Sequence, residues 1–135
     1  MAWYLRISGE NLNIAQLKSE LGLVVASEFH KGEPYLESKP FGKKRRKSGI
    51  SIETSPTYFN NFKQHIKETI NFLEENSGSL KKLESIEIID HKGLDFGIGL
   101  RLNKNDIVVQ VEVYPLRLIP LCSFLGFDIE TTIYS

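Results

Sequence analysis

The sequence predicts a single α+β domain covering residues 1–135, and two observations support that fold class. Short runs rich in β-branched and aromatic residues alternate with apolar residues at helical spacing, which is typical of a sheet packed by helices. The chain is also long enough to bury one core without crosslinks. We expect a mixed, largely antiparallel sheet of about six or seven strands, packed by two main helices and a third, short helix.

The first unit of the chain predicts a strand, a helix and a second strand. Residues 3–7 are rich in β-formers and end at a Ser-Gly pair, as strands do. Asn13 is suited to cap the helix that follows, with Gln16 completing a capping box. Gly22 comes directly after the last apolar position and suits the left-handed conformation that ends helices. Residues 24–29 then predict the second strand.

The middle of the chain predicts a polar loop at residues 35–48, a strand at residues 49–54 and the clearest helix. Ser55 and Pro56 should open that helix, because serine caps helices and proline is favoured at the first helical position. His65 falls on the side expected to be exposed. The opposite side carries an apolar stripe that should lie across the sheet. The stripe is Phe59, Phe62, Ile66, Ile70 and Leu73.

The last part of the chain predicts four more strands and a short helix. The strands are expected at residues 83–90, 94–102, 107–114 and 128–134, with a hairpin turn at 103–106. The helix is expected at residues 118–125 and should stop at Gly126. Ile88, Val109 and Val111 should be buried. The Leu-Gly-apolar helix ending occurs at both ends of the chain, which suggests pseudo-symmetric strand–helix–strand halves, although such endings are also common in unrelated helices.

Composition and charge restrict the function classes. The chain has 17 basic and 17 acidic residues, so it has no overall field that attracts nucleic acid or an anionic membrane. Cys122 is the only cysteine, which excludes an intramolecular disulfide and favours a reducing cytoplasm. The sequence shows neither a signal-peptide pattern nor an apolar run long enough to span a bilayer. We therefore expect a cytoplasmic protein that does not associate with membranes.

The sequence contains no pattern that predicts an enzyme, a metal site or a cofactor site. His30, His65, His91 and Cys122 do not occur at metal-ligand spacings. Asp90 and His91 are adjacent in an expected turn, where they are poorly placed to form an acid–imidazole pair. Gly97 and Gly99 lie inside an expected strand without the third glycine or the helix of a dinucleotide site. Their bare face should pack against the core or, alternatively, form a pocket.

A run of five cations is the strongest surface feature of this neutral chain. It consists of Lys43, Lys44, Arg45, Arg46 and Lys47. Three interpretations stay open: a solvated loop, docking to an acidic protein surface, or binding of nucleic acid or another phosphate ligand. Tyr35 and Phe41 are the nearby aromatic residues, fewer than the stacking platforms of single-strand binders use.

A turn before the cation run is expected to lie on the same rim. It contains His30, Lys31 and Glu33, with Gly32 suited to a positive φ angle and Pro34 to the end of a strand. These residues and the cation run flank one connection. The candidate binding residues are therefore His30, Lys31, Glu33, Lys43, Lys44, Arg45, Arg46 and Lys47.

Five short elements of the sequence resemble a bacterial family known as a domain of unknown function, DUF4279. They are the turn Gly9–Leu12, the helix ending Leu21–Leu23, the aromatic-to-Lys-Gly run Phe29–Gly32, the strand Gly49–Ile52 and the ending from Leu125 to Tyr134. The chain has Phe29 and Ile50 where that family often has tryptophan. The resemblance spans nearly the whole chain and implies no reaction, cofactor or catalytic residues.

Our leading hypothesis is a non-enzymatic protein-binding domain of the bacterial immunity type, because such proteins need a stable scaffold and a charged face but no catalytic group. The alternative is a protein that binds nucleic acid or a phosphate ligand through residues 43–47. A third hypothesis, an enzyme with a pocket over Gly97 and Gly99, requires a deep cleft with convergent polar groups. The sequence does not determine the oligomeric state.

Overall fold

The computed structural model describes residues 2–56, 61–86, 88–100 and 109–134. Within them the chain forms one α+β domain with a mixed, five-stranded sheet in the order β2-β3-β1-β4-β5. The strands are β1 (Trp3–Gly9), β2 (Ser27–Phe29), β3 (Ser48–Ser55), β4 (His91–Gly99) and β5 (Asp128–Tyr134). The helices are α1 (Ile14–Leu21), α2 (Phe62–Glu75), α3 (Ser77–Lys81), a 3₁₀ turn (Lys82–Ser85) and α4 (Leu118–Leu125).

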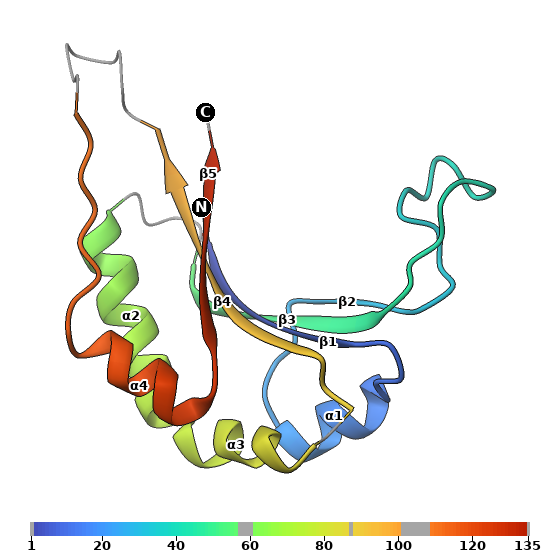
Figure 1. Ribbon diagram of the computed structural model, residues 1–135, viewed down its shortest axis with the longest axis horizontal. Coiled ribbons are helices and arrows are strands. Elements are labelled where there is room, and N and C mark those ends of the chain that lie inside the picture. Colours follow the sequence, from blue (N-terminus) through green and yellow to red (C-terminus); the bar gives the residue numbers. More distant parts are fainter. Residues whose placement is uncertain (1, 57–60, 87, 101–108, 135) are drawn as a thin grey trace.

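The sheet is bent, and its helices lie outside the bend (Figure 1). All neighbouring strands are antiparallel except β4 and β5, which run parallel. Leu5 of β1 is fully buried between Ile52 of β3 and Leu94 of β4, its partners in register. Side chains alternate along β1, so that Arg6 faces the inside of the bend. The helices therefore cover one face of the sheet and leave a polar face open.

Helix α1 is capped much as the sequence predicts. The side chain of Asn13 accepts a hydrogen bond from the Gln16 N–H at 3.1 Å, and Gly22 adopts the left-handed conformation at φ 64°. The Gln16 side chain donates to Glu20 at 3.3 Å. The side chain of Gln16 therefore bonds to Glu20 and not to the backbone of Asn13, so only one of the two hydrogen bonds of the capping box is formed.

Helix α2 begins later than the sequence predicts. Asn61 is its cap, with a side-chain oxygen that accepts from the N–H of Lys63 at 2.9 Å. Ser55 instead ends β3, and its hydroxyl lies 2.7 Å from the ring of His65. The start predicted at Ser55 and Pro56 is therefore wrong. Ile66, Ile70 and Leu73 of the predicted stripe are buried, Phe62 is partly buried, and Phe59 lies outside the described residues.

An aromatic cluster around Trp3 joins the sheet to α2. Trp3 is completely buried, with its ring centroid 4.4 Å from that of Phe96 and 5.0 Å from that of Phe62. Its indole N–H donates to the carbonyl of Gly97 at 2.9 Å. His65 stacks on Trp3 at 4.9 Å and is buried. The prediction that His65 is exposed is therefore wrong. The imidazole can be buried because stacking on Trp3 and the hydrogen bond with Ser55 replace its contacts with water.

In the part of the chain that the structure describes, the sheet has five strands, so the predicted six or seven are not confirmed. Residues 83–86 and 88–90 form no strand, because the chain continues from α2 through α3 into the 3₁₀ turn that ends at Ser85. Residues 109–114 form no strand, and 103–106 lie outside the described residues. Ile88, Val109 and Val111 are exposed, so their predicted burial is wrong.

The predicted pseudo-symmetry is not confirmed. The first predicted unit has both of its strands, β1 and β2, whereas in the second, residues 109–134, the opening strand is missing because residues 109–114 form none. The end of the chain does match its prediction. Helix α4 has the expected bounds, Gly126 ends it at φ 77°, and β5 closes the sheet.

Burial should make the single thiol of this protein unreactive. Cys122 is buried in α4, and burial raises its pKa from 9.0 to about 11. Because the thiolate is the reactive form, we expect native protein at about pH 8 to react with a disulfide reagent far more slowly than protein unfolded in urea. The neutral thiol also favours folding, a contribution that is lost as the pH rises from about 9 to about 11. Equal reaction rates in the two states would contradict this prediction.

Candidate functional site

Residues 30–47, here called the basic arm, form a hydrogen-bonded ribbon that projects from the end of β2 and β3 (Figure 1). Gly32 donates to the Arg45 carbonyl at 2.9 Å, and Arg45 donates to the Glu33 carbonyl at 2.7 Å. Tyr35 donates to the Lys43 carbonyl at 3.1 Å. Gly32 has the predicted positive φ, at 90°. The predicted polar loop is thus an extension of the β2–β3 hairpin with a fixed backbone.

The tip of the basic arm exposes apolar side chains. Two successive turns, from Leu36 to Lys39 and from Lys39 to Gly42, fold the tip through hydrogen bonds of 3.0 Å each. Phe41, in the second turn, is 98% exposed, and Leu36, at the start of the first, is 56% exposed. A fully exposed phenylalanine on a projecting ribbon contributes nothing to the core, so its burial is available for association.

The side chain of Arg45 contacts two aromatic rings. The central carbon of its guanidinium lies 4.6 Å from the ring centroid of Phe29 and 5.0 Å from that of Tyr35. The ammonium of Lys43 lies 5.4 Å from the same Tyr35 ring. Arginine favours such contacts because its planar, weakly hydrated cation is attracted to aromatic faces. Two aromatic rings therefore hold the side chain of Arg45 in place.

Gly49 makes room for the ring on which Arg45 rests. It pairs with Phe29 across β2 and β3. A β-carbon at Gly49 would lie 2.5 Å from the Phe29 ring and 2.8 Å from the carbonyl oxygen of Ile7. The ring thus lies directly over a glycine, a cross-strand arrangement that any larger residue would displace.

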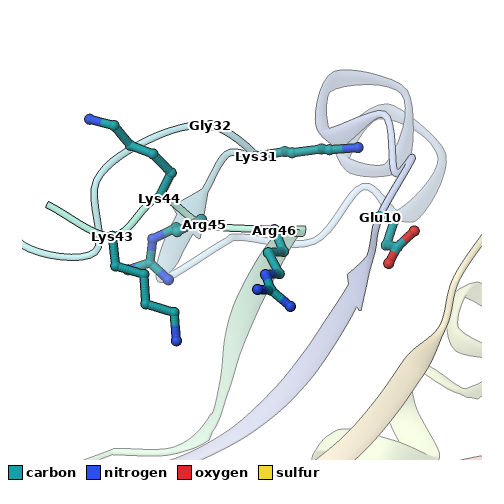
Figure 2. Close-up of a pocket in the computed structure, with 7 residues that line it drawn as sticks. All are labelled: Glu10, Lys31, Gly32, Lys43, Lys44, Arg45 and Arg46. Atoms are coloured by element: carbon teal, nitrogen blue, oxygen red, sulfur yellow. The ribbon is translucent and has the colours of Figure 1, made fainter. Parts of the chain in front are cut away.

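Five cations of the basic arm line an open hollow of about 540 Å³ (Figure 2). Its lining consists of Glu10, Lys31, Gly32, Lys43, Lys44, Arg45 and Arg46. Lys31 is anchored through its backbone N–H, which donates to the Ser48 hydroxyl at 2.9 Å. Among the described residues, no ion pair joins these cations to a carboxylate. Their charge is therefore available to an external anion.

Five of the eight predicted site residues meet at this hollow, and three do not. Lys31, Lys43, Lys44, Arg45 and Arg46 line it. His30 lies instead 3.4 Å from Glu28, Lys47 is exposed away from the lining, and Glu33 contributes its backbone to the ribbon. A hydrogen bond from Lys18 and a second with His30 lower the pKa of Glu28. The sequence did not indicate Glu10 or the contact between Phe29 and Arg45.

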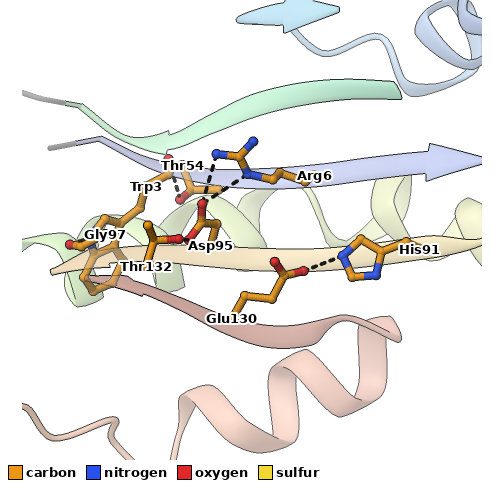
Figure 3. A network of polar contacts seen from close by, with 8 residues as sticks. All are labelled: Trp3, Arg6, Thr54, His91, Asp95, Gly97, Glu130 and Thr132. Carbon is orange, nitrogen blue, oxygen red and sulfur yellow. Dashed lines mark hydrogen bonds and ion pairs between the residues drawn. The ribbon is translucent and has the colours of Figure 1, made fainter. Parts of the chain in front are cut away.

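A second polar cluster lies on the open face of the sheet (Figure 3). Arg6 and Asp95 form an ion pair at 2.9 Å, and the Thr132 hydroxyl donates to Asp95 at 2.6 Å. His91 is paired with Glu130, and their side chains occupy the space above Gly93. His91 lies within β4 and does not pair with the adjacent Asp90, whose carboxylate accepts from the Glu10 N–H.

These polar contacts link neighbouring strands, so the second cluster has a structural role. Asp95 receives donors from both β1 and β5, and the carbonyls of Gly97 and Gly99 accept from Trp3 and Gln110. In residues 2–56, 61–86, 88–100 and 109–134, no three His, Cys, Asp or Glu side chains are grouped to hold a metal ion. No helix in those ranges is long and apolar enough to cross a membrane.

Comparison with known proteins identifies the family. A family described as "Domain of unknown function (DUF4279)" matches residues 1–135. The chain belongs to the DUF4279 family. The match extends through the basic arm, so the arm lies within the DUF4279 domain. No curated protein and no solved structure matches the chain.

Proposed function

We propose that this DUF4279 protein is a non-enzymatic protein-binding domain, of the kind to which immunity proteins belong, and that its basic arm docks on an acidic surface of a partner protein. The observation that supports this most is that five cations line one hollow of a projecting ribbon. The arm has seven basic and two acidic residues, a net charge of +5 in a neutral chain. Such local charge attracts an acidic surface and speeds association.

The tip of the basic arm favours a protein over a nucleic acid as the partner. Phe41 and Leu36 are exposed beside the cations, and protein interfaces combine apolar anchors with a charged rim. Phe29 and Tyr35, in contrast, are already in contact with Arg45. Rings engaged by a cation are poorly available for base stacking, on which single-strand binders depend.

Binding of nucleic acid or another phosphate ligand is the second candidate function. It is favoured by the open form of the hollow and by five cations that no described carboxylate neutralises. Phosphate contacts need only cations along a backbone, and they make affinity strongly dependent on salt.

Removing two charges from the hollow should weaken binding of an acidic probe. We expect K43Q/R46Q to lower the affinity for a fluorescein-labelled Glu/Asp peptide roughly two- to thirtyfold, since each exposed ion pair contributes about 0.2–1 kcal/mol. Fluorescence anisotropy at low salt measures this affinity. Single-stranded oligothymidylate of equal charge is titrated in parallel.

The matched control is K63Q/K67Q, which removes two charges from exposed lysines of α2. It should bind the acidic peptide like the wild type. Equal losses in the two double variants would show that overall charge, and not the basic arm, controls binding. Tighter binding of oligothymidylate than of the peptide would favour the second candidate function. If neither probe binds wild-type protein at low salt, both functions are wrong.

A further inference from the structure

We propose that Arg45 is the specific anchor of the basic arm and that its guanidinium binds one carboxylate group of the partner protein through two parallel hydrogen bonds. This inference rests on the proposed function. Arg46 carries the same group but is exposed, so the inference depends on how the side chain of Arg45 is held by Phe29 and Tyr35. A guanidinium presents its N–H donors in a planar fork that matches a carboxylate, whereas an ammonium acts as a point charge.

The backbone of Arg45 is fixed on both sides. Its N–H donates to Glu33 at 2.7 Å and its carbonyl accepts from Gly32 at 2.9 Å. The bridge between Pro34 and Lys44 continues the ribbon by one more residue. Arg45 is also only partly exposed, whereas its neighbours Lys44 and Arg46 are exposed. The ribbon therefore fixes the backbone from which the side chain of Arg45 projects.

The side chain of Arg45 is ordered before any ligand arrives. Its contacts with Phe29 and Tyr35 restrict its rotamers, so less conformational entropy is lost when the fork closes on a carboxylate. Among the described residues, no carboxylate pairs with its guanidinium. The N–H donors of the Arg45 guanidinium are thus available to a ligand, and the rings of Phe29 and Tyr35 beside them reduce competition from water.

The remaining cations of the arm have a different part in binding. Lys43, Lys44 and Arg46 line the same hollow with more exposed side chains. Exposed charges mainly steer a partner and set the salt dependence of association, whereas an ordered, partly desolvated arginine determines which group is bound. Of the two arginines that line the hollow, Arg45 should consequently be the one that lysine cannot replace.

The test compares a change that keeps the charge with one that removes it. R45K conserves the net charge but removes the planar fork, and K47Q removes one charge from a residue outside the hollow. We expect R45K to weaken binding of the Glu/Asp peptide about tenfold and K47Q to weaken it less than about threefold. Both affinities are measured by anisotropy at one salt concentration, and urea unfolding checks that each variant is folded.

A second variant tests the aromatic support. F29L keeps Arg45 and an apolar residue in β2 but removes the ring under the guanidinium, and it should weaken peptide binding several-fold with no change in net charge. Wild-type affinity in both F29L and R45K would overturn the role of Arg45 while leaving the proposed function intact. A greater loss in K47Q than in R45K would do the same.

The two sources of an oxyanion are separated with a further probe. A phosphoserine peptide of equal net charge offers the same fork a phosphate group. We expect wild-type protein to bind the Glu/Asp peptide at least as tightly. A preference of about tenfold or more for the phosphopeptide would overturn the carboxylate assignment. Absence of binding to both peptides contradicts the proposed function itself.

Discussion

Replacing Trp3 with alanine should destabilise the fold by about 3–5 kcal/mol, the range found for large aromatic-to-alanine changes in cores. Trp3 is completely buried and contacts Phe62 and His65 of α2 as well as Phe96 of β4. Removing it opens a cavity between the sheet and α2 and leaves the Gly97 carbonyl without its indole donor. Because domains of this size have total stabilities of about 5–15 kcal/mol, W3A should be marginally folded at best.

The measurement is urea unfolding followed by far-UV circular dichroism. Trp3 is the only tryptophan, so the fluorescence of wild-type protein gives a second, local record of the same transition. W3F retains a ring but loses the N–H donor and should cost about 1–3 kcal/mol. F41A removes an aromatic residue that is 98% exposed and should change stability by less than about 0.5 kcal/mol. A stability of W3A close to that of F41A would contradict the central place of Trp3.

Local patterns predicted much of the fold correctly. The Asn13 cap, the two left-handed glycines that end α1 and α4, and the bounds of α4 depend on neighbours within a few residues. The α2 stripe was predicted for the same reason. The start of α2 was not predicted correctly, because both Ser55 and Asn61 are good caps and the choice between them depends on a long-range contact. Ser55 bonds to His65, which is placed by stacking on Trp3.

The failed strand predictions have the same physical cause. Residues 83–90 and 109–114 alternate as strands do, but a strand forms only where another edge is available for pairing. In the described residues β5 pairs with β4 instead. Pairing partners far apart in the sequence cannot be read from alternation, which reports only that a residue suits a half-buried surface.

The candidate site was predicted in composition but not in geometry. The run of cations was evident from the sequence, and five of the eight predicted residues do meet at one hollow. The sequence did not show which of these cations contacts an aromatic ring. The contact of Arg45 with Phe29 depends on the register that places Phe29 opposite Gly49. Arg45 itself lies opposite Gly32 and Glu33 in the ribbon, so alternation along the sequence does not place its side chain on the ring of Phe29.

Replacing Gly49 with alanine should destabilise the protein by about 1–3 kcal/mol, the usual cost of overpacking. Secondary-structure propensity predicts the opposite sign, because alanine suits a strand better than glycine does. The added β-carbon would lie 2.5 Å from the Phe29 ring and 2.8 Å from the Ile7 carbonyl oxygen. The ring can turn away, but the carbonyl belongs to the central strand β1 and cannot move without disturbing the sheet.

Gly78 is the matched control for Gly49. It lies in α3, and a β-carbon there would meet nothing within 4 Å. G78A should therefore stabilise the protein by about 0.5–1 kcal/mol, through the lower backbone entropy of alanine in the unfolded chain. Urea unfolding of the two variants should give changes of opposite sign. Stabilisation in both would show that the sheet accommodates a side chain at Gly49.

The G49A/F29A double variant separates the two contacts of the added β-carbon. Removing the ring relieves its clash, so G49A should cost less in the F29A background than in wild-type protein, a coupling of about 0.5–3 kcal/mol. The remaining cost reports the contact with the Ile7 carbonyl, 2.8 Å away. Strictly additive changes would mean that Phe29 does not lie over Gly49. In that case the ring could not support Arg45, and the arm would offer a cluster of cations without a fixed anchor.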